Sequence, residues 1–106
     1  MSSVFDLYGL RHRSIDAARS SVERALAVEF APHESSYLGE YFRVGEMDGE
    51  HLTLQANYHP LEQDWIEPKY ADVPFLLYVN NVASSEETRA RLESDPEINR
   101  LRHSVL

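Results

Sequence analysis

Residues 38–58 read LGEYFRVGEMDGEHLTLQANY, and this stretch decides the fold. In its second half apolar and polar side chains alternate, with Leu52, Leu54, Ala56 and Tyr58 at the apolar positions. Alternation with a period of two is typical of a strand that is covered on one face. Phe42 and Val44 show the same pattern ahead of Asp48-Gly49, a pair that tolerates the positive φ of a hairpin turn. The stretch therefore predicts two antiparallel strands joined by a turn.

One helix is expected before this hairpin in the sequence and a second helix after it. Ser14 has the short hydroxyl side chain that caps a helix N-terminus, and apolar residues follow at spacings of three and four. These residues are Ile15, Ala18, Val22 and Leu26. We expect an amphipathic helix of about four turns that ends near Val28. A shorter helix should begin after Ser84, which forms a capping box with Glu87, and should end near Glu93.

Further strands complete the expected sheet. The run of apolar residues from Phe75 to Val79 indicates a strand buried on both faces, and so one at the centre of the sheet. Pro32 cannot continue a helix and suits an edge strand or a loop. The tail after Pro96 is compatible with either a helix or a strand. The chain is predicted to be one α+β domain over residues 1–106, with an antiparallel sheet of about five strands, one long helix and one short helix.

Composition narrows the classes of function. The chain contains no cysteine, which excludes disulfides and zinc–thiolate sites and fits a reducing cytoplasm. Its first residues do not form a secretory signal, and no apolar run approaches the roughly 20 residues of a membrane span. The net charge is −8, and residues 29–72 alone carry ten acids against Arg43 and Lys69. This acidic segment should repel nucleic acid and attract basic partners, although a solubilising surface has the same composition.

No sequence pattern indicates catalysis or a cofactor. Residues 33–37, HESSY, begin like a zinc-binding HExxH helix, but Tyr37 stands where the second histidine is required. The five histidines are scattered, and no serine lies in a nucleophile-elbow motif. A Ser-His-Asp arrangement of distant residues stays open at this stage. His51 falls on the polar face of its strand, where we expect exposure to solvent. We therefore expect no catalytic residues, no metal and no cofactor.

Aromatic residues mark two candidate surfaces. Trp65 and Tyr70 lie among acids in a segment bounded by Pro60 and Pro74. Large aromatics beside charged residues make good interface anchors, but Trp65 could equally plug the open side of the sheet. Tyr41 and Arg43 alternate with Phe42 and Val44, so they should line the opposite face of the sheet. That face is a second candidate if the helices cover only one side.

Three stretches, HESSYLGEYFRVGE, GEHLTLQANY and PFLLYVNN, together give a resemblance to a known family. They resemble the small bacterial immunity proteins of contact-dependent growth inhibition and related polymorphic toxin systems. The motifs that carry the resemblance are Ser36-Tyr37-Leu38-Gly39-Glu40-Tyr41 and Leu76-Leu77-Tyr78-Val79-Asn80, and it spans most of residues 4–102. It implies a short final strand, no catalytic residues, and the neutralisation of a cognate toxin domain, often a nuclease with a basic cleft.

The predicted partner surface combines this resemblance with the acidic segment. Its residues are Glu40, Glu46, Asp48, Glu50, Glu62, Asp64, Trp65, Glu67, Tyr70 and Asp72. We expect a cytoplasmic, non-enzymatic toxin inhibitor that contacts neither nucleic acid nor membrane directly. Two alternatives stay open: a small hydrolase or isomerase with a histidine–carboxylate site, and a regulatory binding module.

Overall fold

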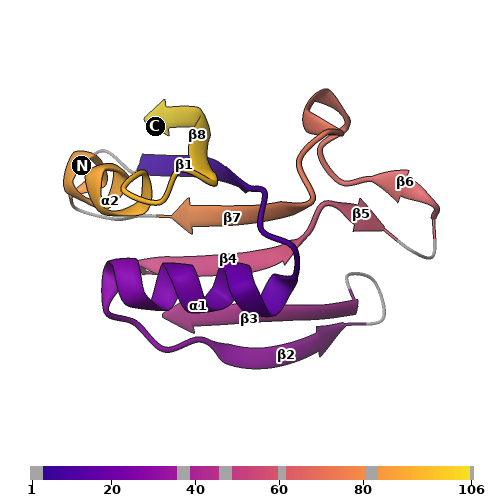
Figure 1. Ribbon diagram of the computed structural model, residues 1–106, viewed down its shortest axis with the longest axis horizontal. Coiled ribbons are helices and arrows are strands. Elements are labelled where there is room, and N and C mark those ends of the chain that lie inside the picture. The colour runs from indigo at the N-terminus through magenta and orange to yellow at the C-terminus, as the bar shows by residue number, and fades with distance from the viewer. Residues whose placement is uncertain (1–3, 36–38, 46–48, 60–61, 81–83, 106) are drawn as a thin grey trace.

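A six-stranded antiparallel sheet with two helices forms the molecule in the computed structural model, which describes residues 4–35, 39–45, 49–59, 62–80 and 84–105 (Figure 1). The strand order is β2-β3-β4-β7-β1-β8. The strands are β1 (Val4–Leu10), β2 (Ala31–Ser35), β3 (Gly39–Gly45), β4 (His51–Ala56), β7 (Phe75–Asn80) and β8 (Ile98–Val105). The helices are α1 (Ile15–Leu26) and α2 (Ser85–Leu92). The predicted α+β class is confirmed, with one strand more than the five or so expected.

The predicted hairpin is formed by β3 and β4. Phe42 pairs with Leu54 and Val44 pairs with Leu52, so the alternating apolar side chains of both strands share one face. Residues 46–48 of the connection lie outside the described residues. Gly45 closes β3 with φ +94°, and a Cβ at this position would lie 2.2 Å from the carbonyl oxygen of Glu50. Only glycine satisfies both requirements, so Gly45 fixes the end of the hairpin.

Both helices pack against the same face of the sheet. Ala18 and Val22 of α1 and Leu92 of α2 join one buried cluster with sheet residues such as Leu54 and Leu77. In Figure 1, α1 lies across β3 and β4, and α2 lies near β1. Neither helix of the described chain is both long and apolar enough to cross a membrane. The opposite face carries Tyr41 and Arg43, as their alternation predicted.

The helix boundaries follow local capping chemistry at one helix and not at the other. The Ser14 hydroxyl accepts a hydrogen bond from the Ala17 N–H at 3.1 Å, as predicted for an N-cap. The helix ends at Leu26, slightly before the predicted end near Val28. The next residue, Ala27, adopts a left-handed conformation with φ 55°. Ser84 precedes α2, but its side chain makes no capping hydrogen bond to the described residues. The second helix was therefore predicted correctly, whereas the capping box behind the prediction does not form.

Strand positions follow from burial and from missing hydrogen-bond donors. β7 lies between β4 and β1, as its apolar run predicted. Pro32 lies in β2 at the edge of the sheet, where its missing N–H costs no ladder hydrogen bond. The tail forms β8, which pairs with β1 from Val4–Val105 to Leu10–Ile98. The final strand implied by the family resemblance is therefore confirmed, but at eight residues it is not the short strand that was expected.

Candidate functional site

Asn57 directs the chain away from the sheet and positions the candidate site. Its side chain is fully buried, and its amide donates hydrogen bonds to the carbonyl oxygens of Tyr70 and Val73, each at 2.9 Å. Its side-chain oxygen accepts from the Glu67 N–H at 2.8 Å, and its own N–H donates to the Pro74 carbonyl at 2.9 Å. One buried amide thus holds together the two ends of the segment between β4 and β7.

The chain then forms a small antiparallel ribbon outside the main sheet. We call it the β5–β6 ribbon; it consists of β5 (Tyr58–His59) and β6 (Asp64–Trp65) and extends from one end of the molecule (Figure 1). The rings of Tyr58 and Trp65 meet edge to face, with centroids 5.3 Å apart. These two residues are 44% and 37% exposed. Trp65 therefore does not plug the open face of the sheet, and an aromatic pair faces solvent.

Tyr58 was assigned to the apolar face of β4 from sequence, and that assignment is wrong. The strand ends at Ala56, and Asn57 satisfies its hydrogen bonds with the following segment rather than with a neighbouring strand of the sheet. Tyr58 therefore falls on the β5–β6 ribbon, where it supports Trp65. Sequence reasoning missed it as a site residue. The only signal in the sequence was Asn57, a polar residue within the run of alternating apolar and polar side chains. An asparagine at such a position does not by itself predict that the chain leaves the sheet.

The second predicted anchor, Tyr70, lies in a short 3₁₀ turn, η1 (Pro68–Tyr70), and is half-buried. Its hydroxyl donates a hydrogen bond to the Leu101 carbonyl of β8 at 3.2 Å, and Lys69 lies over its ring at 5.8 Å. The hydrogen bond to Leu101 ties the segment to the sheet. Tyr70 therefore has a structural role, and Trp65 is the more exposed of the two aromatic residues.

Two of the predicted acids already have partners within the molecule. Glu67 accepts a hydrogen bond from the Tyr78 hydroxyl at 2.7 Å and pairs with Arg102 at 3.3 Å. Burial and the hydrogen bond to Glu67 raise the pKa of the Tyr78 hydroxyl above its usual range. Asp72 pairs with Arg11 at 3.0 Å, and this hydrogen bond lowers the pKa of the Asp72 carboxyl. Neither acid is fully available to a partner.

The remaining acids of the middle segment differ from acids elsewhere in the chain. Every acidic residue before residue 29 or after residue 72 either forms an ion pair with an arginine or has a carboxylate oxygen within 3.4 Å of a histidine nitrogen. Within residues 29–72, six exposed acids make no ion pair with the described residues. They are Glu29, Glu34, Glu40, Glu50, Glu62 and Asp64. Glu46 and Asp48 lie outside the described residues. The unpaired negative charge is therefore concentrated in this segment.

These unpaired acids divide between the two ends of β4. Glu50 immediately precedes the strand, whereas Asp64 of the β5–β6 ribbon and Glu62, between its two strands, lie beyond the other end. A six-residue strand is about 20 Å long, so the two groups cannot contact the same side chain of a partner. The predicted surface is thus divided between two separate places on the molecule.

The ribbon end of the molecule gathers the larger share of the unpaired acids. The end of β2 and the start of β3 lie at the same end of the longest axis as the β5–β6 ribbon (Figure 1). Glu34 and Glu40 are direct cross-strand partners there, next to the pair Ser35–Gly39 that ends the two strands. Like charges opposite one another destabilise a strand pair, and a cationic partner would relieve the repulsion. An exposed aromatic pair and several unpaired carboxylates therefore occur together at this end.

A serine–aspartate–histidine cluster also occurs, but its order differs from that of a catalytic triad. Asp95 accepts hydrogen bonds from Ser21 and from His12 Nε2, the latter at 2.8 Å. In a triad the histidine stands between the other two and removes the serine proton. Here the aspartate stands between them, and both Ser21 and His12 are buried. The cluster joins α1 to the loops before α1 and after α2, and it does not activate the serine.

The same His12 and Asp95 lie near Glu97, and their ligand atoms fall within 4.8 Å of one another. A histidine with two carboxylates is a donor set that a metal ion could use. Hydrogen bonds already account for these contacts, because Asp95 Oδ2 is shared by Ser21 and His12 and Asp95 Oδ1 accepts from the Glu97 N–H at 2.9 Å. We interpret the cluster as a link between loops.

This cluster predicts how stability depends on pH. Burial raises the pKa of the Asp95 carboxyl, but hydrogen bonds from Ser21, the Glu97 N–H and His12 outweigh it and lower the pKa to about 2. Because the folded pKa lies below the ordinary value of 3.8, Asp95 stabilises the fold fully above about pH 4, and this contribution is lost as the pH falls towards 2. Asp95→Asn should cost about 2 kcal/mol at pH 7. Unfolding measured across that range should show a flatter pH dependence for the variant; an unchanged slope would contradict the assignment.

Two other histidines lie in specific contacts rather than in a catalytic arrangement. His103 Nδ1 contacts the buried Asp6 carboxylate at 2.5 Å, and no described serine or threonine hydroxyl is hydrogen-bonded to either residue. His51 was expected on the surface, and that expectation is wrong. It is buried, with Nδ1 at 2.9 Å from the Gly49 carbonyl and Nε2 at 3.0 Å from the Asn80 amide nitrogen. These contacts supply no nucleophile for the hydrolase alternative.

No protein-family model matches the chain, and no curated protein matches it in sequence.

Proposed function

We propose that this protein is an immunity protein that binds a cognate toxin domain in the bacterial cytoplasm and neutralises it by covering its active site. The observation that carries the proposal is the exposed Tyr58–Trp65 pair at the end of the molecule that holds unpaired carboxylates. The partner that suits this surface is a basic domain, for which a nuclease with a cationic cleft is the main candidate. An inhibitor of this kind requires no catalytic chemistry of its own.

The physical case rests on two separate contributions to binding. A large aromatic that loses water at the centre of an interface supplies most of the affinity in typical complexes. Charges at the rim act mainly on the rate of association, because they attract a complementary partner over a long range. Trp65 can supply the first contribution, and Glu40, Glu62 and Asp64 can supply the second. The net charge of −8 also disfavours direct binding to nucleic acid.

Co-expression provides the test of this function. An immunity gene lies directly downstream of its toxin gene, so the polypeptide encoded directly upstream of this protein is the partner to test. We expect growth arrest when that polypeptide is expressed alone, and protection together with copurification when both are expressed. If the upstream polypeptide neither arrests growth nor copurifies, the immunity function fails. The regulatory-module alternative would then be the better interpretation.

Trp65→Ala should speed dissociation of the complex about 30-fold, which corresponds to a hot spot of about 2 kcal/mol. The reason is the loss of the exposed aromatic area, while the rim charges that govern association are retained. Surface plasmon resonance with the purified partner would measure both rates. Tyr41→Ala, on the sheet face opposite the helices, is the matched control and should dissociate like the wild type. The reverse outcome would move the interface to the open face of the sheet.

A further inference from the structure

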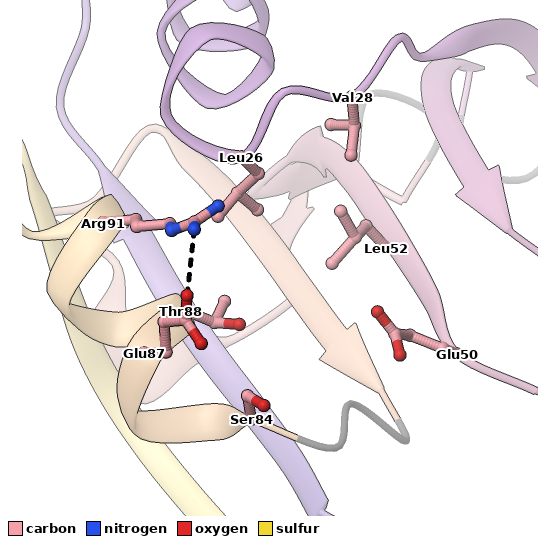
Figure 2. A pocket seen from close by; sticks show the side chains of 8 residues that line it. All are labelled: Leu26, Val28, Glu50, Leu52, Ser84, Glu87, Thr88 and Arg91. Atoms are coloured by element: carbon pink, nitrogen blue, oxygen red, sulfur yellow. Dashed lines mark hydrogen bonds and ion pairs between the residues drawn. The ribbon is translucent and has the colours of Figure 1, made fainter.

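A second feature of the acidic segment is a hollow of about 210 Å³ between α1, β4 and α2 (Figure 2). Leu26 from the end of α1, Val28 from the following loop and Leu52 from β4 form its apolar lining. Its polar lining consists of Glu50, Ser84, Glu87, Thr88 and Arg91. Figure 2 shows Glu50 on one side of this hollow and the residues of α2 on the other. Both apolar and charged groups therefore border the same opening.

The hollow continues into a neighbouring depression of about 190 Å³ that shares Val28, Glu50 and Leu52 and extends to Val44. We call the two together the α1–β4–α2 groove. Leu26, Val28 and Val44 pack against the core but are only partly buried, so apolar surface stays in contact with water along the groove. Covering such surface releases free energy in proportion to its area. The groove is therefore suited to an apolar side chain of another molecule.

The charges around the groove indicate what should accompany that side chain. Arg91 forms an ion pair with Glu87 at 2.9 Å, so these two charges offset one another. Glu50 is exposed and makes no ion pair with the described residues. Among the described residues, the unpaired charge at the groove is thus negative. A cation next to the apolar side chain would complement Glu50.

We propose that the α1–β4–α2 groove is a second docking point for the same toxin domain and receives an aliphatic side chain that neighbours a lysine or arginine. This inference rests on the proposed function and adds a site that the β5–β6 ribbon does not include. The groove and the ribbon lie at opposite ends of β4, about 20 Å apart. A standard interface covers about 800 Å² on each partner, or about 30 Å across, so one partner can reach both.

Kinetic measurements on variants of the full chain with the purified upstream-encoded toxin domain test this inference. Val28→Phe fills the groove and should speed dissociation at least tenfold. Glu50→Lys should weaken binding at least tenfold, chiefly through slower association. Glu50→Gln, which removes the charge without reversing it, should give a smaller loss in the same direction. Circular dichroism and thermal melting would verify that each variant is folded.

Matched controls separate contact from general effects of charge or bulk. Glu86→Lys makes the same charge change one residue before Glu87, on a side of α2 that does not line the groove, and should change affinity less than threefold. Val105→Phe adds the same ring at an exposed position of the edge strand β8 and should leave both rates unchanged.

The outcomes distinguish this inference from the proposed function. If Val28→Phe and Glu50→Lys bind within twofold of the wild type while Trp65→Ala dissociates faster, the groove is not a docking point, and the immunity function stands. If Glu86→Lys weakens binding as much as Glu50→Lys, net charge accounts for the effect and the groove is again excluded. If the wild-type chain does not bind the domain, the proposed function fails, and the inference fails with it.

Discussion

Asn57→Ala is expected to lower the free energy of unfolding by roughly 3–5 kcal/mol, because it removes the three hydrogen bonds that the buried Asn57 side chain makes to the backbone of the following segment. The Val73 carbonyl oxygen and the Glu67 N–H lose the partner that Asn57 provides, whereas the Tyr70 carbonyl oxygen keeps its hydrogen bond from the Val73 N–H at 2.9 Å. Each unsatisfied buried group costs about 1–3 kcal/mol. Equilibrium denaturation in urea would measure the loss.

A second substitution at this position tests the same explanation. Asn57→Asp keeps the shape and the acceptor for Glu67, but it places a carboxylate oxygen against the carbonyl oxygens of Tyr70 and Val73. It should destabilise the fold at least as much as alanine does. Asn99→Ala on β8, where the side chain is exposed, should change stability by less than about 0.5 kcal/mol. A loss below about 1 kcal/mol for both Asn57 variants would contradict its role in holding the segment.

Leu77→Ala is the second substitution with a large expected effect, a loss of about 2–5 kcal/mol. Leu77 is 0% exposed, in the central strand β7, and its neighbours in register are Tyr8 of β1 and Leu54 of β4. Removing its side chain leaves a cavity in the cluster that also receives both helices, so lost burial and lost packing add.

Denaturant unfolding followed by circular dichroism would measure this loss. Val105→Ala provides the control, because Val105 is 54% exposed on the edge strand β8 and its truncation should cost less than about 0.5 kcal/mol. A loss below about 0.5 kcal/mol for Leu77→Ala would mean that β7 does not occupy the centre of the core.

The two classes of substitution also separate folding from binding. Asn57 and Leu77 should act on stability first, and on binding only through the position of the β5–β6 ribbon. Trp65 and Glu50 are exposed, so their replacement should act on the complex while leaving the isolated chain folded. Measuring stability and affinity for the same variants would therefore assign each residue to one role.

Local chemistry in the sequence determined most of the elements. The alternation around Leu52 and Leu54 predicted a hairpin strand, Ser14 predicted the start of α1, and the run around Leu77 predicted the central strand. Pro32 predicted an edge strand or loop from its missing donor alone. Each of these properties depends on a residue and its near neighbours, so it can be read without knowing the partners.

Only the tertiary structure decided which side chains of the candidate site are exposed and which of its acids form ion pairs. Tyr58 continues the alternation of β4, yet the buried hydrogen bonds of Asn57 turn the chain and expose it beside Trp65. Glu67 and Glu62 are both acids of the same segment, but Arg102 pairs with Glu67 across 35 residues of chain, whereas Glu62 has no ion pair with any residue that the structure describes. Glu50 and Trp65 likewise belong to one acidic segment, and β4 separates them. These differences arise from contacts between residues that are distant in sequence, and local patterns carry no record of such contacts.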